Sequence, residues 1–401
     1  MASINCKSRR DDIPTDGFTH PSFALLKEVF KRNFEMNLEP SGAAFAAYHR
    51  GKLVADLYGG YSDKDKKLPW REETMTILFS TTKSLASICL AILIDRGKAS
   101  YDDLVCKYWP KFANNGKGCI TIKQVVQHEA GLPYDNQILS VNDVLDHERM
   151  AKFFERMTPL WQPGEKCGYH ALTFGFLVDQ LVRRLDDKKR GVVEFFHEEI
   201  VSKHGLNGIS IGLENDEQND RVAYITSITD EQIKLEAEQN PEGARKYKLA
   251  DNIHNKKLYE SWPWIQIHHY NKLENRRIPM ASNMGIGTAR DLAKVHSLIV
   301  EGKLLSERFL RQIQYPQLDE MDIINGYPEN KGFGWIYNKN TLGNWNFGHS
   351  GYGGQNVRVD LDSKLAYAYI CSGLKAADAD NVRPFANLQA CLYECLKKNC
   401  S

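Results

Sequence analysis

The chain has 401 residues, of which 42% are hydrophobic and 26% are charged. This composition is typical of a globular protein with a sizeable core. Its 52 basic and 51 acidic side chains leave a formal net charge of +1. That balance argues against nucleic-acid binding, which normally shows a basic excess. Short basic runs such as Lys188-Lys189-Arg190 are interpreted as solvated surface.

The N-terminal residues and the cysteines bear on the compartment. Residues 1–17 are polar and lack the apolar segment of a secretory signal. The longest apolar run, around Leu85 to Ile94, is too short to span a membrane. Nine cysteines are scattered without Cys-x-x-Cys pairs, and this odd number favours free thiols. We therefore expect an intracellular, cytoplasmic protein.

A helix is predicted near the N-terminus, with a β-hairpin directly after it. From about Ser22 to Asn37, apolar residues recur with helical spacing. Two strand-like runs follow at residues 43–48 and 53–58, and the short Arg50-Gly51 turn between them predicts a hairpin. A stretch richer in helix patterns then extends from residue 76 to residue 285.

The end of the chain returns to strands. A final amphipathic helix is predicted over residues 384–398, and the strand-like runs before it span residues 333–337, 345–349, 356–361 and 364–370. Strands at both ends with helices between them predict an α+β fold, in which one antiparallel sheet is built from both termini and flanked by helices. The middle would form a mostly helical subdomain, with a cleft between the two parts.

These patterns also set the expected limits of the domains. Residues 1–18 would be a polar tail, and residues 19–75 and 286–401 would form the sheet-containing subdomain. Residues 76–285 would form the helical subdomain, in which residues 213–280 are unusually polar. We interpret this polar stretch as a surface insertion. A lid over the cleft is the alternative, because long ordered insertions often determine specificity.

The pattern Ser-x-x-Lys occurs twice, at Ser80–Lys83 and at Ser372–Lys375. Alone it is weak, because chance supplies a pattern this short in long chains. The surroundings of the two copies differ. Ser372 ends a strand and leads into the polar sequence AADADN, whereas Ser80 precedes a run that is apolar on almost every side of a helix. The first copy is therefore predicted at the start of a buried helix.

A serine followed by a lysine one helical turn later can act as a nucleophile with its base. Residues three apart share a helix face, so the Lys83 amine can reach the Ser80 hydroxyl. A serine is a poor nucleophile until a base takes its proton, and a lysine can do so when burial makes its amine neutral. The helix N-terminus would favour a developing oxyanion. The alternative is a plain helix cap with a solvated lysine.

Two further segments hold candidate partners. In the first, a Pro163-Gly164 turn precedes Tyr169 and an amphipathic helix. A tyrosine near a lysine can give up or shuttle a proton. In the second, residues 347–354 form a glycine-rich strand end that a substrate can approach closely. His349 in this segment could hold a substrate carboxylate or polarise a leaving group. Taken singly, each of these side chains would more commonly be structural.

The order of these elements resembles the serine β-lactamase and penicillin-binding-protein superfamily. The resemblance covers about residues 20–395 and is strongest to the class-C-like branch, which includes carboxylesterases and the β-lactamase-like proteins of animals. Residues 127–133 (QHEAGLP) resemble its SHxxGLP segment, and residues 287–293 (GTARDLA) resemble the start of its STARDLA helix. The resemblance implies a β-lactamase/transpeptidase-like fold.

It also implies a chemical role for each matching residue. Ser80 would form the acyl-enzyme, and Lys83 and Tyr169 would share the general-base and general-acid work. His349 would take the place of the strand lysine of the family. The backbone N–H groups of Ser80 and Tyr352 would form the oxyanion hole.

The expected substrate contacts are His170 and Gly351, and two neighbouring positions depart from the β-lactamase pattern. Where β-lactamases have Tyr-x-Asn, Ala171 replaces the amide that contacts the antibiotic side chain. His349 stands where they usually have a lysine, which weakens binding of an antibiotic carboxylate. Both replacements fit the esterase branch. We therefore expect a serine hydrolase that transfers an acyl group from a small ester or amide, more like an esterase than a true β-lactamase.

Two other functions stay open. The chain could be a peptidase acting on D-amino or short peptides, or a non-catalytic scaffold that uses the fold for assembly. Intact Ser80, Lys83 and Tyr169 argue against the scaffold. No cofactor or metal is expected: His197 precedes two glutamates but lacks the histidine at i+4 that a zinc helix needs. The expected partner is the small-molecule substrate, with no nucleic acid and no membrane span, and a homo-oligomer is left open.

Overall fold

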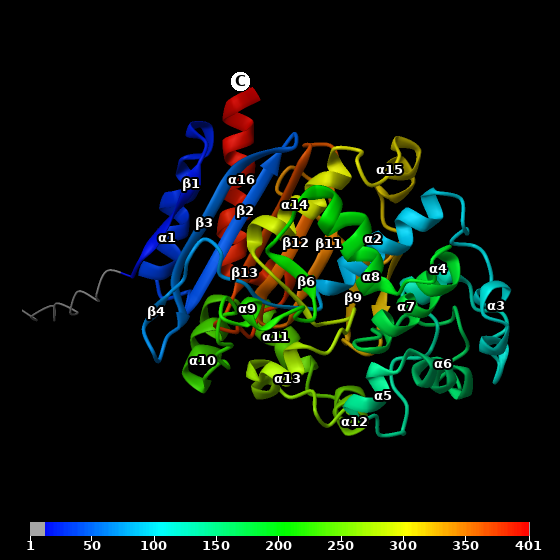
Figure 1. The fold of residues 1–401 in the computed structure, drawn as a ribbon. Helices are drawn as coiled ribbons and strands as arrows, with labels where there is room; N and C mark the ends of the chain where they lie inside the picture. The colour runs from blue at the N-terminus through cyan, green and yellow to red at the C-terminus, as the bar shows by residue number, and fades with distance from the viewer. Residues whose placement is uncertain (1–12, 401) are drawn as a thin grey trace, which may run out of the picture.

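The computed structural model describes residues 13–400 (Figure 1). Residues 1–12 lie outside this range. They form most of the expected polar tail and of the segment in which a secretory signal was not expected. The rest of that tail is not a tail, because strand β1 (Thr15–Thr19) begins within it and pairs with the main sheet. Within the described range, the helices are too short or too polar to cross a membrane.

One antiparallel sheet is built from both ends of the chain, as the sequence predicts (Figure 1). Its strands are β1 (Thr15–Thr19), β2 (Gly42–His49), β3 (Lys52–Asp63), β4 (Leu68–Pro69), β8 (Leu318–Asp322), β9 (Tyr327–Gly332), β10 (Trp335–Lys339), β11 (Trp345–Gly351), β12 (Gln355–Asp360) and β13 (Leu365–Cys371). Their order is β1-β3-β2-β13-β12-β11-β10-β9-β8, with β4 paired to β3. The two ends of the chain meet where β2 pairs with β13, with Ala46 opposite Ala368.

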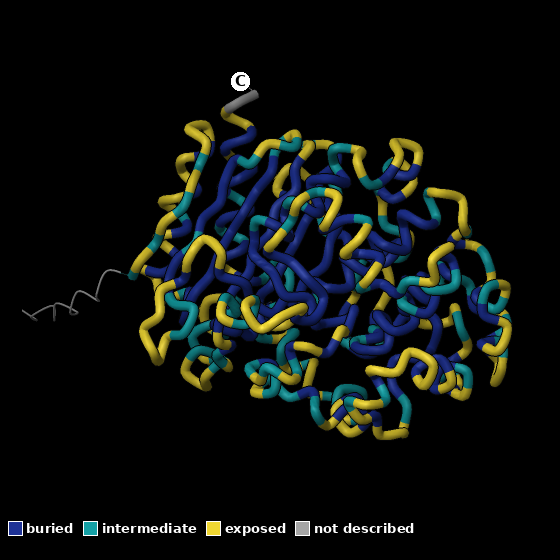
Figure 2. The backbone as a smooth tube through the Cα atoms, in the orientation of Figure 1, coloured by how far each residue is buried: buried dark blue, intermediate teal, exposed yellow. Residues whose placement is uncertain are grey.

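Helices cover both faces of this sheet. They are α1 (Leu25–Glu35), α2 (Thr82–Asp95), α14 (Ala289–Val300) and α16 (Arg383–Cys400). α1 and α16 pack together on one face, and α14 and α2 lie on the other. Each face has its own apolar cluster. Phe45 of β2 belongs to the cluster under α1 and α16, and Ala46 belongs to the cluster under α2 and α14, because successive strand side chains point to opposite faces. Figure 2 shows most of the central strands in the colour of buried residues.

The middle of the chain is mostly helical but also forms a second, smaller sheet. Its strands are β5 (Thr76–Phe79), β6 (Ile209–Ile211) and β7 (Gly285–Gly287), in the order β5-β7-β6. The sequence pattern predicts no strand here, because these segments are too short to show alternation. The helices of this part outside the polar stretch are α3 (Val105–Tyr108), α4 (Ile122–Val126), α5 (Val141–Leu145), α6 (His147–Arg156), α7 (Thr173–Leu185) and α8 (Val192–Phe196).

The polar stretch at residues 213–280 is ordered and folds into short helices. They are α9 (Asp216–Asn219), α10 (Asp230–Gln239), α11 (Pro241–Leu249), α12 (Ile253–Ser261) and α13 (Leu273–Arg276). Capping residues explain several of these starts: the Thr229 side chain accepts from the Gln232 N–H at the start of α10. A further helix, α15 (Glu307–Ile313), follows α14. Short helical turns span Pro21–Phe23, Pro110–Ala113, His197–Val201, Ser202–His204, Ile267–Asn271, Tyr352–Gly354 and Ala379–Asn381.

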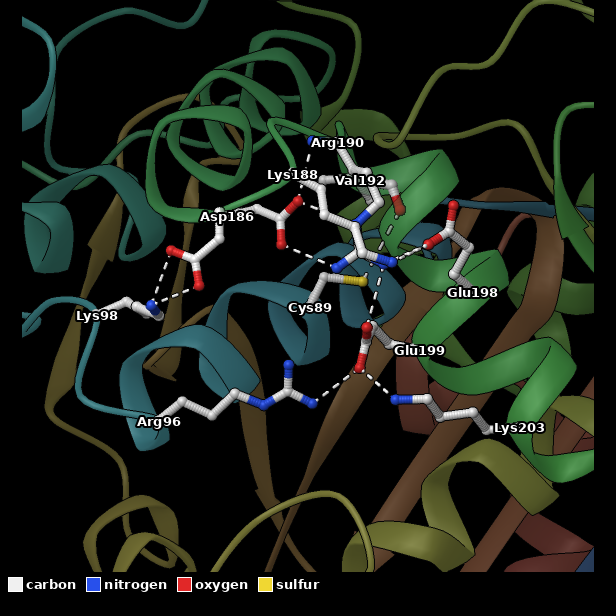
Figure 3. Close-up of polar contacts among 11 residues, drawn as sticks. Cys89, Arg96, Lys98, Asp186, Lys188, Arg190, Val192, Glu198, Glu199 and Lys203 are labelled. Atoms are coloured by element: carbon white, nitrogen blue, oxygen red, sulfur yellow. Dashed lines mark hydrogen bonds and ion pairs between the residues drawn. The ribbon is translucent and has the colours of Figure 1, made fainter.

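An ion-pair network fixes the C-terminal end of α2 (Figure 3). Arg190 bonds Asp186 at 2.8 Å and Glu199 at 3.1 Å, and Glu199 also accepts from Arg96, just after α2, at 2.9 Å. The Arg190 side chain is only 9% exposed. Interpreting the whole basic run as solvated surface is therefore wrong for Arg190, because three acidic partners, the third being Glu198, satisfy its guanidinium.

Candidate active site

Ser80 lies in the turn between β5 and α2. The residue before it, Phe79, has a left-handed backbone with φ of 46°, a conformation that costs energy in a bulky residue. The Thr82 hydroxyl donates to the Phe79 carbonyl at 2.6 Å and the Lys83 N–H donates to the Ser80 carbonyl at 2.9 Å. The predicted helix start is shifted by two residues, because α2 begins at Thr82. Ser80 is thus held at a strained turn directly before the helix.

Lys83 is fully buried in the first turn of α2, which runs through the core as predicted. Burial lowers the pKa of its amine well below the ordinary lysine value. The amine contacts the Ser80 hydroxyl at 3.1 Å. It also donates to the carbonyl oxygens of Ala171 at 2.7 Å and Ser282 at 3.1 Å.

The three contacts of this amine determine where its lone pair points. A neutral amine has two N–H bonds and one lone pair, and carbonyl oxygens can only accept. The two N–H bonds are therefore directed to the carbonyls of Ala171 and Ser282. The lone pair is left for the third neighbour, the Ser80 hydroxyl. This arrangement suits removal of the serine proton.

Tyr169 contacts both members of the pair. The Ser80 hydroxyl is near enough to its phenol to affect the phenol's pKa, and the Lys83 amine lies 4.8 Å from the centre of its ring. Burial raises the pKa of Tyr169 above the ordinary tyrosine value, and the Ser80 hydroxyl offsets this only in part. The phenol therefore keeps its proton near neutral pH. This differs from the expected easy loss of the proton and makes Tyr169 a donor.

A buried acidic group that sequence reasoning missed positions Tyr169. Asp322, at the end of β8, accepts the Tyr169 N–H at 3.1 Å and the Ile324 N–H at 2.9 Å. Its other oxygen bonds the Lys331 amine at 2.5 Å, and this amine also pairs with Glu329 at 3.0 Å. The sequence around Asp322 has no motif that marks it, so only the folded chain reveals this support.

His349 lies on β11 beside the same tyrosine, with the two ring centres 6.1 Å apart. Burial, followed by the neighbouring Lys83 amine, lowers the pKa of His349 well below its ordinary value, so the ring is neutral. Its Nδ1 lies 2.6 Å from the Ser350 carbonyl. A neutral ring is a poor partner for a carboxylate, so the expected carboxylate-holding role does not fit this geometry.

The end of β11 packs directly against the turn that holds Ser80. A Cβ on Gly351 would lie 2.3 Å from the Leu78 carbonyl oxygen, so only glycine fits there. The Tyr352 ring lies 5.8 Å from the Phe79 ring. The backbone of Tyr352 is thereby brought beside the Ser80 turn, as an oxyanion hole of their two N–H groups requires.

His170 does not lie in the site, although the sequence analysis expects it to contact substrate. Its Nε2 accepts the Leu132 N–H at 2.9 Å, and its Nδ1 bonds the Gly168 carbonyl at 2.7 Å. The backbone N–H of His170 donates to Nδ1 of His128 at 3.0 Å. The ring is fully buried and both ring nitrogens are occupied by backbone. His170 therefore holds together the segment before α7 and leaves no polar atom for a ligand.

A cavity of about 590 Å³ opens in front of Ser80. Tyr169, His349 and Tyr352 line this cavity. The polar stretch also contributes to the lining, with Lys246, Tyr247, Ala250, Asp251, Asn255, Leu258, Tyr259, Ile265, Gln266, Ile267 and Tyr270. A volume of this size is typical of a small-molecule site. The polar stretch thus borders the cleft, as the lid alternative expects.

Three comparisons with known proteins identify the family and the fold of this chain. A family model described as Beta-lactamase matches residues 30–392. The esterase/beta-lactamase LipL of Mycobacterium tuberculosis is 28% identical over 372 residues, covering 88% of this chain and 82% of LipL.

Solved structures show the same fold. A family VIII carboxylesterase superposes with a TM-score of 0.83 at 26% identity, covering 96% of this chain and 100% of that chain. A penicillin-binding-protein homologue from Caulobacter crescentus gives a TM-score of 0.80 at 28% identity, with 94% and 100% coverage. The predicted α+β fold of this type is therefore confirmed.

Proposed function

Because this chain belongs to the beta-lactamase family, we propose that it is a serine hydrolase that cleaves small esters or amides through an acyl-enzyme on Ser80. One observation carries the proposal. The buried Lys83 amine contacts the Ser80 hydroxyl and two backbone carbonyls, so that in its neutral form it donates to the carbonyls and directs its lone pair to Ser80. A helix cap with a solvated lysine would not be buried in this way.

Acylation follows from the positions of these groups. Lys83 takes the proton of Ser80 while the serine oxygen attacks the substrate carbonyl carbon. Negative charge then develops on the carbonyl oxygen, where the N–H groups of Ser80 and Tyr352 would stabilise it. As the bond to the leaving group breaks, the proton passes from Lys83 to the leaving group through the protonated phenol of Tyr169.

Deacylation repeats the same transfers with water. The neutral Lys83 amine accepts a proton from water, and the hydroxide attacks the acyl carbonyl carbon. The bond to Ser80 breaks, and the serine oxygen regains a proton from Lys83 or Tyr169. All groups return to their initial protonation states, so no cofactor is required by these steps.

The esterase preference is part of the proposal. It is supported by Ala171 in place of the β-lactamase asparagine and by the neutral ring of His349. It is also supported by the carboxylesterase and the esterase/beta-lactamase among the similar proteins. An intracellular location stays a prediction, and the oligomeric state stays open.

A covalent-labelling experiment tests this function. A fluorophosphonate probe should add one adduct to the intact chain, detected by mass spectrometry, and Ser80→Ala should abolish both the adduct and the turnover of p-nitrophenyl butyrate. Ser372→Ala is the matched control and should label normally, because Ser372 lies in the second copy of the pattern. Equal labelling of Ser80→Ala and wild type would overturn the proposal.

A substrate panel separates the alternatives. Esters, D-amino amides, short peptides and the β-lactam nitrocefin should be compared by kcat/KM at one pH. We expect the neutral esters to be turned over fastest. Exclusive cleavage of peptides would favour the peptidase, and absence of both turnover and labelling would favour the non-catalytic scaffold.

A further inference from the structure

The two ring nitrogens of His349 are in different situations. Nδ1 lies 2.6 Å from the Ser350 carbonyl oxygen, and a carbonyl can only accept, so Nδ1 carries the proton. Nε2 is buried and bonds no other group in residues 13–400. In a neutral ring with its proton on Nδ1, Nε2 is a bare lone pair. His349 therefore holds a buried hydrogen-bond acceptor without a partner in the described residues, and His349 is one of the residues that line the cavity.

Among the residues the structure describes, each lysine that lines the cavity contacts a neighbouring side chain. Lys83 is buried and directs its N–H bonds to backbone carbonyls. Lys375 is paired with Glu39 at 2.9 Å, and Lys246 lies over the Tyr327 ring at 4.4 Å. These two are the lysines that line the cavity.

Acidic side chains also line the cavity and would disfavour an anionic substrate. Asp251, Glu329 and Asp378 line the same cavity. Asp378 accepts from the Tyr327 hydroxyl at 3.3 Å, and Glu329 is paired with Lys331 at 3.0 Å. An anionic substrate group beside His349 would meet a lone pair in place of an N–H donor, so the ring would not compensate the loss of its hydration.

We propose that His349 is a specificity-determining residue that selects substrates with a hydroxyl or amide N–H near the scissile carbonyl and rejects those with a carboxylate there. The inference rests on the proposed Ser80 chemistry and deepens it. A buried acceptor left unpaired is costly, so a substrate that supplies the donor gains over one that cannot. The same bare Nε2 has no proton to give, so the leaving group is protonated from Lys83 and Tyr169.

Matched esters with one leaving group test the selection. The p-nitrophenyl esters of 3-hydroxybutyrate and 3-methoxybutyrate differ in a donor, as do those of N-acetylglycine and N-acetylsarcosine. The hydrogen succinate ester supplies the carboxylate. In wild type, the donor ester of at least one pair should exceed its partner in kcat/KM by roughly fivefold to tenfold. The succinate ester should be slower than both donor esters.

Two variants connect these ratios to the ring. His349→Leu keeps an apolar body without the acceptor, so the donor preference should fall towards unity. His349→Lys supplies a cation, so the succinate ester should gain relative to the neutral esters. Equal ratios in wild type and His349→Leu, or a wild-type preference for the succinate ester, would overturn the inference. A purely structural role would lower all rates together and leave the ratios unchanged.

A spectroscopic measurement keeps the inference testable if no ester is turned over. The ¹⁵N spectrum of histidine-labelled protein, assigned by comparison with His349→Gln, should show the neutral ring with its proton on Nδ1 near pH 7. A proton on Nε2, or an imidazolium, would overturn the inference. Loss of Ser80 labelling and of all turnover would instead overturn the proposed function, so the two failures are distinguishable.

Discussion

The chain contains the pattern Ser-x-x-Lys twice, and the two copies fold into opposite environments. Lys83 is buried and pairs with no carboxylate in the described part of the chain, and its amine contacts Ser80 at 3.1 Å. Lys375 is equally buried, but it pairs with Glu39 at 2.9 Å and bonds the Gly373 carbonyl at 3.1 Å.

The two serines differ in the same way. Ser80 lines the open cavity. Ser372 is fully buried at the end of β13 and is bonded to the Ser41 hydroxyl at 3.2 Å and to the Gly42 N–H at 3.3 Å. The pattern alone therefore does not make a nucleophile. A reactive pair needs a lysine whose charge is not stabilised and a serine that a substrate can reach.

Lys83→Met should have the largest effect on turnover, and it distinguishes the two Ser-x-x-Lys copies most clearly. Without the base, kcat for a neutral ester should fall roughly a thousandfold or more. The free energy of unfolding should stay equal or rise, because a buried amine without a counter-charge is removed. Steady-state kinetics and urea unfolding measure the two quantities. A strongly destabilised variant would mean that Lys83 is mainly structural.

Lys375→Met should lower the stability of the protein more than its turnover per folded molecule, the reverse of Lys83→Met. The variant leaves Glu39 buried without its cation, and breaking a buried pair costs about 3–5 kcal/mol of folding free energy. Urea unfolding of Lys375→Met, Glu39→Gln and the double variant forms a complete cycle. We expect the double variant to recover much of the loss, since no charge is left alone. Additive losses in the double variant would contradict the pairing.

The pH dependence of the two copies should differ because burial lowers the pKa of Lys83. The rate depends on the neutral amine, so kcat/KM should fall up to tenfold for each pH unit below that lowered pKa. At pH values between that lowered pKa and the ordinary lysine pKa of about 10.4, Lys83 is protonated in the unfolded chain but largely neutral in the folded chain. The stability of wild type relative to Lys83→Met should therefore rise with pH in this window.

The second lysine gives the contrast. Burial alone would lower the pKa of Lys375, but Cys371 and Glu39 outweigh it and raise that pKa above the ordinary value. Lys375 thus stays charged across the whole range, and its contribution to stability is lost only as the pH rises past its ordinary value towards the raised pKa. Unfolding curves of both lysine variants at several pH values check these opposite trends.

Ser372→Ala should have the smallest effect. It removes hydrogen bonds of a buried hydroxyl, which costs about 1–2 kcal/mol, and leaves the cavity unchanged. Turnover per folded molecule and labelling at Ser80 should match wild type. A loss of turnover as large as that of Ser80→Ala would show that the second copy takes part in catalysis.

Much of the fold follows from local patterns in the sequence. The buried helix after Ser80 and the sheet from both termini are confirmed, because long segments with a clear apolar period fold as that period requires. The β8–β9 hairpin is missed, although the Asn325-Gly326 pair in its turn is typical of hairpins. Its strands have polar and apolar residues in no clear alternation, so only the turn could have marked it.

The site was less predictable where backbone atoms position the catalytic side chains. The carbonyls of Ala171 and Ser282 that orient Lys83 come from segments far apart in the chain, and any residue type has such a carbonyl. His170 shows the converse, because a side chain next to Tyr169 in sequence points into the framework and not into the cavity. Adjacency in a motif therefore does not predict which way a side chain faces.

The polar stretch at residues 213–280 supplies a wall of the cavity but none of the groups that contact the Lys83 amine. Ser282, which does, follows directly after it. Part of the cavity lining is thereby separate in the chain from the groups that contact the Lys83 amine. Lining residues of this stretch that are remote from Ser80 are candidates for substitution, whereas the Tyr270 ring lies 4.9 Å from the ring of Phe79, the residue before Ser80. Such a separation makes this stretch the natural place to diversify the enzyme by directed evolution.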